Sequence, residues 1–208
     1  MTGTIALLGG GPFEANDDLD RRLLTEAGAT EVVVMPTADA FEHPRDLIDA
    51  SRAWAERIGV AVRPLEIYTR GDALDVDVDA AIGDAVAVYL VGDSPIHLRS
   101  VLTDTDLWAA IAAVVERGGL IAAVAGSAAA LCNPMTDPRG GAFTIGLGLI
   151  DGLAVATETE TWTEERLHRT RDLADVPVAE VPTGAALLRR NGSWEIVGDV
   201  VIDGELPH

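Results

Sequence analysis

The sequence predicts an α/β protein built around a mainly parallel sheet. Short apolar runs rich in Val, Ile and Ala alternate with longer stretches whose apolar residues recur at helical spacing. The run from Ala85 to Val91 is apolar without a break, as expected of a strand covered on both faces. With 208 residues and no repeat or linker, the chain fits one domain over residues 1–208.

Capping residues define the elements in the first part of the chain. Asn16 caps the first predicted helix and Gly28 ends it, because glycine readily takes the left-handed conformation that closes a helix. Pro44 starts the second helix and Gly59 ends it. We expect strands at Thr4 to Leu8, Glu31 to Met35 and Val60 to Leu65, and helices at Asp17 to Ala27 and Pro44 to Ile58. The acidic run from Asp72 to Asp79 reads as a solvated edge segment.

Beyond the strand at Ala85 to Val91, the elements become shorter toward the C-terminus. Pro95 follows a turn and starts a helix, and Gly118-Gly119 separate the next helix from a strand. We expect helices at Pro95 to Leu102, Leu107 to Arg117 and Thr163 to Ala174, and strands at Leu120 to Val124, Leu153 to Thr157, Ala185 to Arg189 and Trp194 to Ile202.

The charge balance excludes several classes of partner. The chain has 15 Lys and Arg against 34 Asp and Glu, a net charge of −19, which would repel nucleic acid and anionic membranes. Its single cysteine, Cys132, forms no internal disulfide and no metal-ligand pattern, in keeping with a reducing compartment. There is no signal-peptide pattern and no apolar run near the roughly 18 residues of a membrane span. We therefore expect a soluble cytoplasmic protein.

In a parallel sheet, the loops that follow the strands meet at one edge, where binding sites form. Ser127 stands in one such loop, within Ala125-Gly126-Ser127-Ala128-Ala129. A small-x-Ser-x-small sequence between a strand and a helix can expose a serine hydroxyl and aim amide groups at an oxyanion. Gly and Ser also simply make turns, so two readings of Ser127 stay open, a nucleophile or a turn residue.

Several segments, in order, resemble one family. "AGSAAA" is similar to the Gly-x-Ser-Ala-Gly-Ala nucleophile motif of the peptidase E and cyanophycinase family of serine peptidases. Further segments that resemble this family are "IALLGGGPFE", "VVVMPTADA", "VYLVGDSPIHLRSVL", "DPRGGAFTIGLGLIDGLAV" and "TGAALLRRNGSWEIVG". The resemblance covers nearly the whole chain.

The resemblance implies a fold and an activity. The fold is a three-layer α/β/α sandwich of the class I glutamine-amidotransferase-like, flavodoxin-like kind, with a strand-to-helix nucleophile elbow at Ser127. The activity is hydrolysis of small Asp-containing peptides by a Ser-His-acid set. The residues that match are Ser127 as nucleophile, the amides of Gly92 and Ala128 as oxyanion donors, Asp137 as a candidate acid, and Gly10, Gly11 and Asp93 as binding-edge residues.

The base is missing from its expected place. Counting from Gly152 puts Glu158 on the family histidine, and counting back from Arg166-Leu167 puts Thr161 there. The other candidates are His97 and His43, on loops of the carboxyl edge, and the helix residue His168. A glutamate with an ordinary pKa near 4.3 is a weak base at neutral pH unless burial raises that pKa.

Two functions therefore remain open. The first is a serine peptidase that acts on a small acidic peptide or amide through Ser127 with an atypical base. The second is an inactive homologue that binds a small ligand or a protein partner at the same site. We expect no cofactor, because the glycine loop at 9–11 lacks the spacing of nucleotide-binding motifs. We also expect no metal, because no histidine accompanies the acidic residues. The resemblance also suggests a homo-oligomer.

Overall fold

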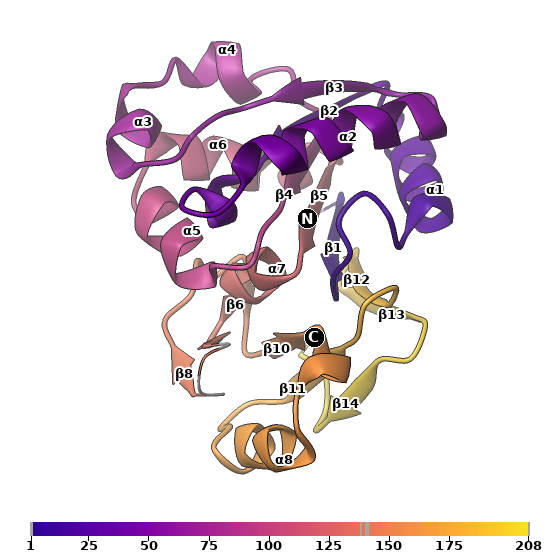
Figure 1. Cartoon of the computed structure of the whole chain (residues 1–208), viewed down its shortest axis with the longest axis vertical. Helices are drawn as coiled ribbons and strands as arrows, with labels where there is room; N and C mark the ends of the chain where they lie inside the picture. The colour runs from indigo at the N-terminus through magenta and orange to yellow at the C-terminus, as the bar shows by residue number, and fades with distance from the viewer. Residues whose placement is uncertain (1, 138, 140–141, 208) are drawn as a thin grey trace.

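The computed structural model describes residues 2–137, 139 and 142–207, and its centre is a sheet of seven strands (Figure 1). The strand order is β13-β12-β1-β5-β4-β2-β3. The strands are β1 (Thr4–Leu8), β2 (Glu31–Met35), β3 (Ala61–Pro64), β4 (Ala87–Leu90), β5 (Leu120–Val124), β12 (Ala186–Arg190) and β13 (Ser193–Val197). Strands β1 to β5 pair in parallel, and β12 and β13 add an antiparallel hairpin. The predicted α/β class with a mainly parallel sheet is confirmed.

The order of the parallel strands differs from the flavodoxin pattern. Counted along the chain, the five parallel strands lie in the order 3-2-4-5-1, whereas flavodoxin has 2-1-3-4-5. Strand β1 lies beyond β5, and β12 covers its outer side, so the wholly apolar residues Ile5 to Leu8 are buried.

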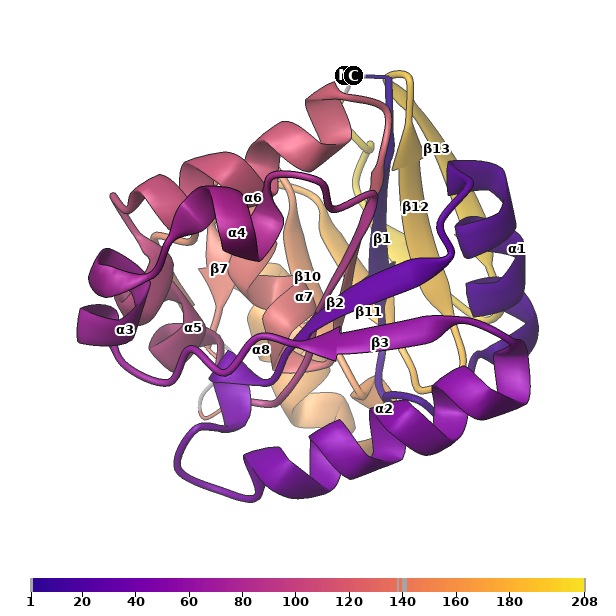
Figure 2. The same cartoon turned by 90° about the horizontal axis from the view of Figure 1, so that it is seen from above.

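Helices cover both faces of the sheet (Figure 2). On one face, Leu23 and Leu24 of α1 (Asp17–Ala27) and Trp54 of α2 (Pro44–Ile58) pack on one apolar core. On the other face, α5 (Pro95–Leu102), α6 (Asp106–Glu116) and α7 (Gly126–Leu131) contribute to a second core. Two cores on opposite faces make three layers.

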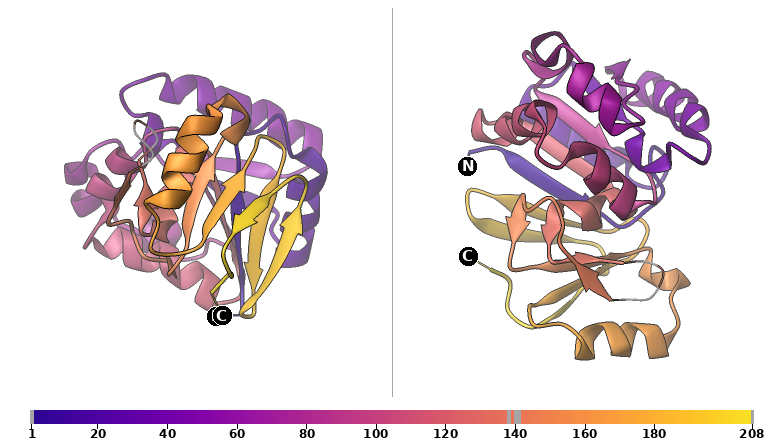
Figure 3. Two further views of the ribbon diagram at one scale, coloured as in Figure 1. Left: turned by 90° about the horizontal axis from the view of Figure 1, so that it is seen from below. Right: turned by 90° about the vertical axis from the view of Figure 1, so that its left-hand side faces the viewer.

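Apart from β12 and β13, which join the main sheet, the chain after α7 builds a smaller unit beside that sheet (Figure 3). Its three-stranded sheet has the order β10-β11-β14, and two short strand pairs and helix α8 accompany it. The elements are β6 (Cys132–Asn133), β7 (Met135–Thr136), β8 (Phe143–Thr144), β9 (Ile150–Asp151), β10 (Ala154–Thr157), α8 (Glu164–Asp172), β11 (Val178–Val181) and β14 (Val201–Asp203). Short 3-10 turns lie at η1 (Thr37–Asp39) and η2 (Thr159–Thr161). The predicted strand from Trp194 to Ile202 is two strands in different sheets, because the chain turns at Gly198 with a φ of 76°.

The acidic run at 72–79 is exposed to solvent, as predicted, but it forms two short helices, α3 (Arg70–Asp75) and α4 (Val78–Ile82), rather than an edge segment without regular structure. The physical reason is capping. Asp72 and Thr69 form a reciprocal capping box at the start of α3, and Asp77 accepts a hydrogen bond from the amide of Ala80 at the start of α4. Asp72 and Asp77 therefore accept hydrogen bonds from backbone amides at the starts of α3 and α4.

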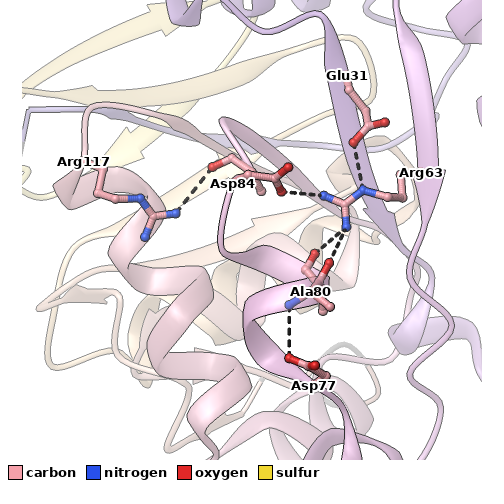
Figure 4. A network of polar contacts seen from close by, with 8 residues as sticks. Glu31, Arg63, Asp77, Ala80, Asp84 and Arg117 are labelled. Carbon is pink, nitrogen blue, oxygen red and sulfur yellow. Dashed lines mark hydrogen bonds and ion pairs between the residues drawn. The ribbon is translucent and has the colours of Figure 1, made fainter.

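Arg63 ties this helical segment to the sheet (Figure 4). From β3, its Nε donates to Glu31 on the neighbouring strand at 2.8 Å, and its Nη1 donates to the carbonyl of Ala81 at 2.6 Å. Its Nη2 also lies 3.3 Å from Asp84. One side chain therefore links β2, β3 and the end of α4. In the part of the chain that the structure describes, no helix is long and apolar enough to cross a membrane.

Candidate active site

The loops after the parallel strands meet at the carboxyl edge, as the sequence predicts. The amide of Asp93, after β4, donates to Asp39 Oδ1 at 2.8 Å, which joins the loops after β4 and β2. The amide of Glu158, after β10, donates to the carbonyl of Gly9 at 3.1 Å, and the amide of Ser127 donates to the carbonyl of Gly92 at 2.9 Å. Segments from five strands therefore share one edge.

The strained residue at the strand-to-helix reversal is Ala125. Strand β5 ends at Val124 and α7 begins at Gly126, so the reversal falls on Ala125, with φ 58° and ψ −134°. This conformation is costly for a residue with a Cβ and is the one that a nucleophile takes in an elbow. Ser127 lies two residues later, inside the first turn of α7. We predicted that Ser127 would occupy the strained turn; in the structure Ala125 occupies it.

The hydroxyl of Ser127 forms a structural hydrogen bond. The side chain is fully buried, and its Oγ donates to the carbonyl of Gly92 at 3.2 Å. The same carbonyl accepts the Ser127 amide at 2.9 Å. A serine nucleophile needs a base within hydrogen-bond reach, and the Ser127 hydroxyl points at a carbonyl oxygen instead. These two bonds fasten α7 to the loop after β4.

The Ala128 amide, one of the two expected oxyanion donors, is engaged inside the start of α7. The amide of Ala128 donates to the carbonyl of Ala125 at 3.0 Å, because it closes the turn that starts the helix. Gly92 presents its carbonyl to Ser127. Gly92 also has a φ of 117°, and a Cβ there would lie 2.6 Å from Asp39 Oδ1, so both backbone conformation and space require glycine.

None of the described histidines bonds to Ser127. His97 Nε2 lies 2.9 Å from the carbonyl of Tyr68, and its ring packs edge-on against Phe41. His168 is exposed, with its Nδ1 2.8 Å from Asp172 on the same helix. His43 is exposed and precedes Pro44 at the start of α2. His97 and His168 thus have local partners of their own.

Asp137, the candidate acid, is held by an arginine of its own loop. Its Oδ1 accepts from the Arg139 Nε at 3.1 Å and from the Arg139 amide at 3.0 Å, and its Oδ2 accepts from Nη2 at 3.2 Å. These hydrogen bonds keep the pKa of Asp137 below its usual value. Asp137 is therefore an ionised turn residue.

Glu158 lies at the edge, next to the glycine loop after β1. It has a left-handed φ of 52°, and a Cβ on Gly10 would lie 2.6 Å from its Cγ, so the glutamate packs directly on the loop backbone. Burial raises its pKa to about 7, and the nearby carboxylates of Asp93, Glu160 and Asp39 add to the rise. Gly11 turns the loop toward α1 with a φ of 64°.

A pocket of about 400 Å³ opens beside this edge. It combines four carboxylates with one guanidinium and with apolar and imidazole groups; the main lining residues are Asp39, Phe41, Glu42, Asp93, Pro95, His97, Asp137 and Arg139. Burial raises the pKa of Asp93, and Asp39 and Glu42 add to that rise. No three His, Cys, Asp or Glu side chains of the described residues are arranged to hold a metal ion.

Reasoning from the sequence missed Ala125, because alanine carries no chemistry. The signal was present in the expected strand, which ends at Val124 and leaves Ala125 as the first residue of the reversal. The contact of Arg166 with Trp162 was also missed; the guanidinium carbon lies 3.4 Å from the centroid of the indole ring.

Comparison with known proteins identifies the family. A family model described as peptidase family S51 matches residues 5–197. The chain belongs to peptidase family S51. The predicted membership of the peptidase E and cyanophycinase family is thereby confirmed.

Solved structures of similar fold include two bacterial proteins. A peptidase from an acI-B1 actinobacterium superposes with a TM-score of 0.84 at 24% sequence identity, covering 96% of this chain and 88% of that one. A candidate peptidase E protein from Listeria monocytogenes EGD-e gives a TM-score of 0.71 at 14% identity, covering 98% of each chain. No curated protein sequence matches this S51 chain. At these identities, the likeness supports the fold.

Proposed function

We propose that this S51 member binds a small peptide at the carboxyl edge of its sheet without a serine nucleophile to cleave it. The observation that carries the proposal is Ala125 in the strained strand-to-helix position. An elbow presents its nucleophile from that residue, and a methyl group cannot attack a peptide carbonyl. We therefore assign the nucleophile position of the elbow to Ala125 rather than to Ser127.

The surrounding groups support the same conclusion. Covalent hydrolysis requires a nucleophile, a base and oxyanion donors in one place. The Ser127 hydroxyl is buried against the Gly92 carbonyl, and the Ala128 amide is occupied by Ala125. By the family resemblance, either Glu158 or Thr161 falls at the histidine position, and neither alignment places an imidazole there.

The lining of the 400 Å³ pocket favours a peptide as ligand. Asp39, Glu42 and Asp93 supply negative charge, which suits the terminal ammonium group of a peptide, and Phe41 and Pro95 supply apolar surface. Membership of a peptidase family supports the same ligand class.

Hydrolysis through Ser127 with an atypical base is the second candidate, and family membership favours it. The two candidates predict different effects of substitution on turnover of the dipeptide Asp-Leu. We expect no turnover by the wild-type chain, and none by Ser127→Ala. Turnover by the wild-type chain that Ser127→Ala abolishes would establish the second candidate and contradict the first.

A gain-of-function variant sharpens this test. Ala125→Ser combined with Glu158→His places a hydroxyl at the strained position and an imidazole at one of the two positions that the resemblance aligns with the family histidine. We expect this double variant to gain measurable Asp-Leu turnover, and each single variant to show less, because nucleophile and base act as a unit. Equal activity in the wild-type chain and the double variant would contradict the role assigned to Ala125.

A further inference from the structure

Asp20 of α1 is a buried carboxylate held by neutral hydrogen-bond donors. The residue is 3% exposed. Its Oδ2 accepts a hydrogen bond from the indole Nε1 of Trp54 at 3.0 Å, and its Oδ1 accepts one from the hydroxyl of Tyr89 at 3.0 Å. These bonds join α1 to α2 and to β4. Buried carboxylates are ordinarily paired with a cation, so a carboxylate held by an indole and a phenol requires an explanation.

The three side chains satisfy one another differently in the two protonation states of Asp20. The ionised carboxylate accepts the indole proton and the phenol proton, so two donors meet two oxygens, but a charge is held out of water. The protonated carboxyl removes that charge and brings a third donor to the same few acceptors. Burial is the larger effect and raises the pKa of Asp20 to about 6, whereas the bonds from Tyr89 and Trp54 oppose the rise.

The other ionisable groups around Asp20 keep their charge state near neutral pH. On the same helix, Asp17 adds to the rise in the pKa of Asp20 and is itself paired with Arg57 of α2, at 2.7 and 2.9 Å. The hydroxyl of Tyr89 stays protonated, because burial raises its pKa well above the usual value. Strand β5, which also contacts α1, has only apolar side chains. Asp20 is therefore the member of this network whose charge changes.

An aromatic contact connects Asp20 to the segment at 9–13, which contains the glycine loop after β1. The ring centroid of Trp54 lies 5.2 Å from that of Phe13. Phe13 has a φ of 66°, which is unfavourable for a residue with a Cβ and persists only where its surroundings hold it. Arg57 donates to the Phe13 carbonyl at 2.6 Å. The segment is thus strained, and it packs on the same indole that bonds to Asp20.

We propose that Asp20 is a pH-sensitive switch for the segment at 9–13. The protonated carboxyl keeps Trp54 and Phe13 packed over it, and its ionisation favours an open form in which water reaches the carboxylate. The direction follows from linkage. A carboxyl that is buried in the closed form and hydrated in the open form binds its proton more tightly in the closed form. Low pH therefore favours the closed form, and the open form gains as pH rises.

The switch acts on one wall of the carboxyl edge. The Gly9 carbonyl accepts the Glu158 amide, and the Glu158 side chain packs on Gly10, so movement of the segment changes the contacts of Glu158. The inference goes beyond the proposed function and is independent of it, since it requires neither a ligand nor a nucleophile.

Amide hydrogen exchange followed by NMR tests the opening. The Ala15 amide donates to the Gly11 carbonyl at 3.0 Å and reports on the segment. All chains carry Glu158→Gln, because Glu158 packs on Gly10 and its pKa of about 7 would add a second titration. Between pH 5 and 8, we expect the protection factor of Ala15 to fall about tenfold, the change produced by a pKa of about 6 in the closed form and about 4 in the open form.

Two variants of α1 identify the group responsible. Asp20→Asn keeps the shape of the side chain and loses its titration, so the protection factor of Ala15 should stay constant within about twofold over the same range. Asp18→Asn, at a fully exposed position of the same helix, is the matched control and should keep the tenfold fall. The Ser127 amide, bonded to the Gly92 carbonyl in another loop of the edge, should show no such fall in any chain.

The indole proton of Trp54 gives a second readout that leaves Asp20 intact. Its NMR resonance, assigned by its loss in Trp54→Phe, should shift with pH about a midpoint near 6. The inference is overturned if this resonance does not titrate, or if folded Asp20→Asn retains the tenfold fall at Ala15. Equal falls at Ala15 and Ser127 would show global rather than local opening and would overturn it as well. If Asp20→Asn does not fold, the indole titration and the comparison of Ala15 with Ser127 decide.

Discussion

Two regions at the carboxyl edge differ in whether their buried polar groups are hydrogen-bonded. At the start of α7, the hydroxyl and amide of Ser127 both donate to the Gly92 carbonyl, and the Ala128 amide donates to Ala125. Beside α8, the Nε and Nη2 atoms of Arg166 and the Thr136 hydroxyl are buried and unpaired among the described residues. Paired groups stabilise the fold, whereas buried groups without a hydrogen-bond partner reduce its stability. The hydrogen bonds of a polar side chain therefore say more about its role than its residue type does.

The largest expected effect tests the backbone that receives Ser127. Gly92→Ala should lower the free energy of unfolding by about 3 kcal/mol or more, because a φ of 117° and a close approach to Asp39 both oppose a Cβ. Gly148→Ala is the control, since Gly148 has a φ of 71° with nothing within 4 Å of a new Cβ, and should cost about 1 kcal/mol. Equal losses in urea denaturation would contradict a tightly fitted Gly92 loop.

Glu158, which packs on the glycine loop at the same edge, should make stability depend on pH. Its pKa rises from 4.5 to about 7 in the folded protein, so the folded state favours the protonated carboxyl. Its contribution to stability is full below pH 4.5, falls as pH rises to 7 and is lost above it. Between pH 4.5 and 7, Glu158→Gln should remove about 1 to 2 kcal/mol of the pH-dependent change in unfolding free energy, after allowance for solvent screening. The plot of Tm against pH should therefore be flatter for this variant. An unchanged slope would show that Glu158 is not buried among carboxylates.

The paired hydroxyl should matter to stability by itself. Ser127→Ala removes the bond from Oγ to Gly92 and should cost about 1 kcal/mol, while the amide bond to the same carbonyl remains. Chemical denaturation measures this loss. A stability gain in Ser127→Ala would be typical of a strained catalytic group and would contradict a structural hydroxyl.

The smallest effect is expected at the unpaired hydroxyl. Thr136→Val replaces a buried donor that has no partner among the described residues by a methyl group of similar size, so it should leave stability unchanged or raise it by up to about 1 kcal/mol. The comparison with Ser127→Ala in the same denaturation assay is direct. A loss at Thr136 as large as that at Ser127 would remove the distinction between the two regions.

The main sheet could be predicted from the sequence because its strands are short apolar runs between strong stop signals. Strands β1, β2 and β5 have the bounds that their apolar runs predict, and Gly28 and Gly59 end α1 and α2 as expected. The acidic run at 72–79 was harder, since an aspartate that caps a helix and one that faces solvent look the same in sequence.

The site depends on tertiary contacts that local sequence does not encode. Two small residues, Ala125 and Gly126, precede Ser127, and only the strand register decides which of them takes the strained conformation. Trp162 stacks on the guanidinium of Arg166, and its buried Nε and Nη2 bond to no described residue, although Asp137 is close enough to interact with its charge. An arginine in an amphipathic helix gives no sign of this from its neighbours in sequence.

The most direct test of the account is the intact mass of the wild-type protein after treatment with a fluorophosphonate probe, with peptide mapping of any adduct. The Ala125→Ser and Glu158→His double variant is the positive control, and Ser127→Ala is the negative control. The account predicts no adduct on the wild-type chain across pH 5 to 9. A stoichiometric adduct on Ser127 that disappears in Ser127→Ala would contradict it.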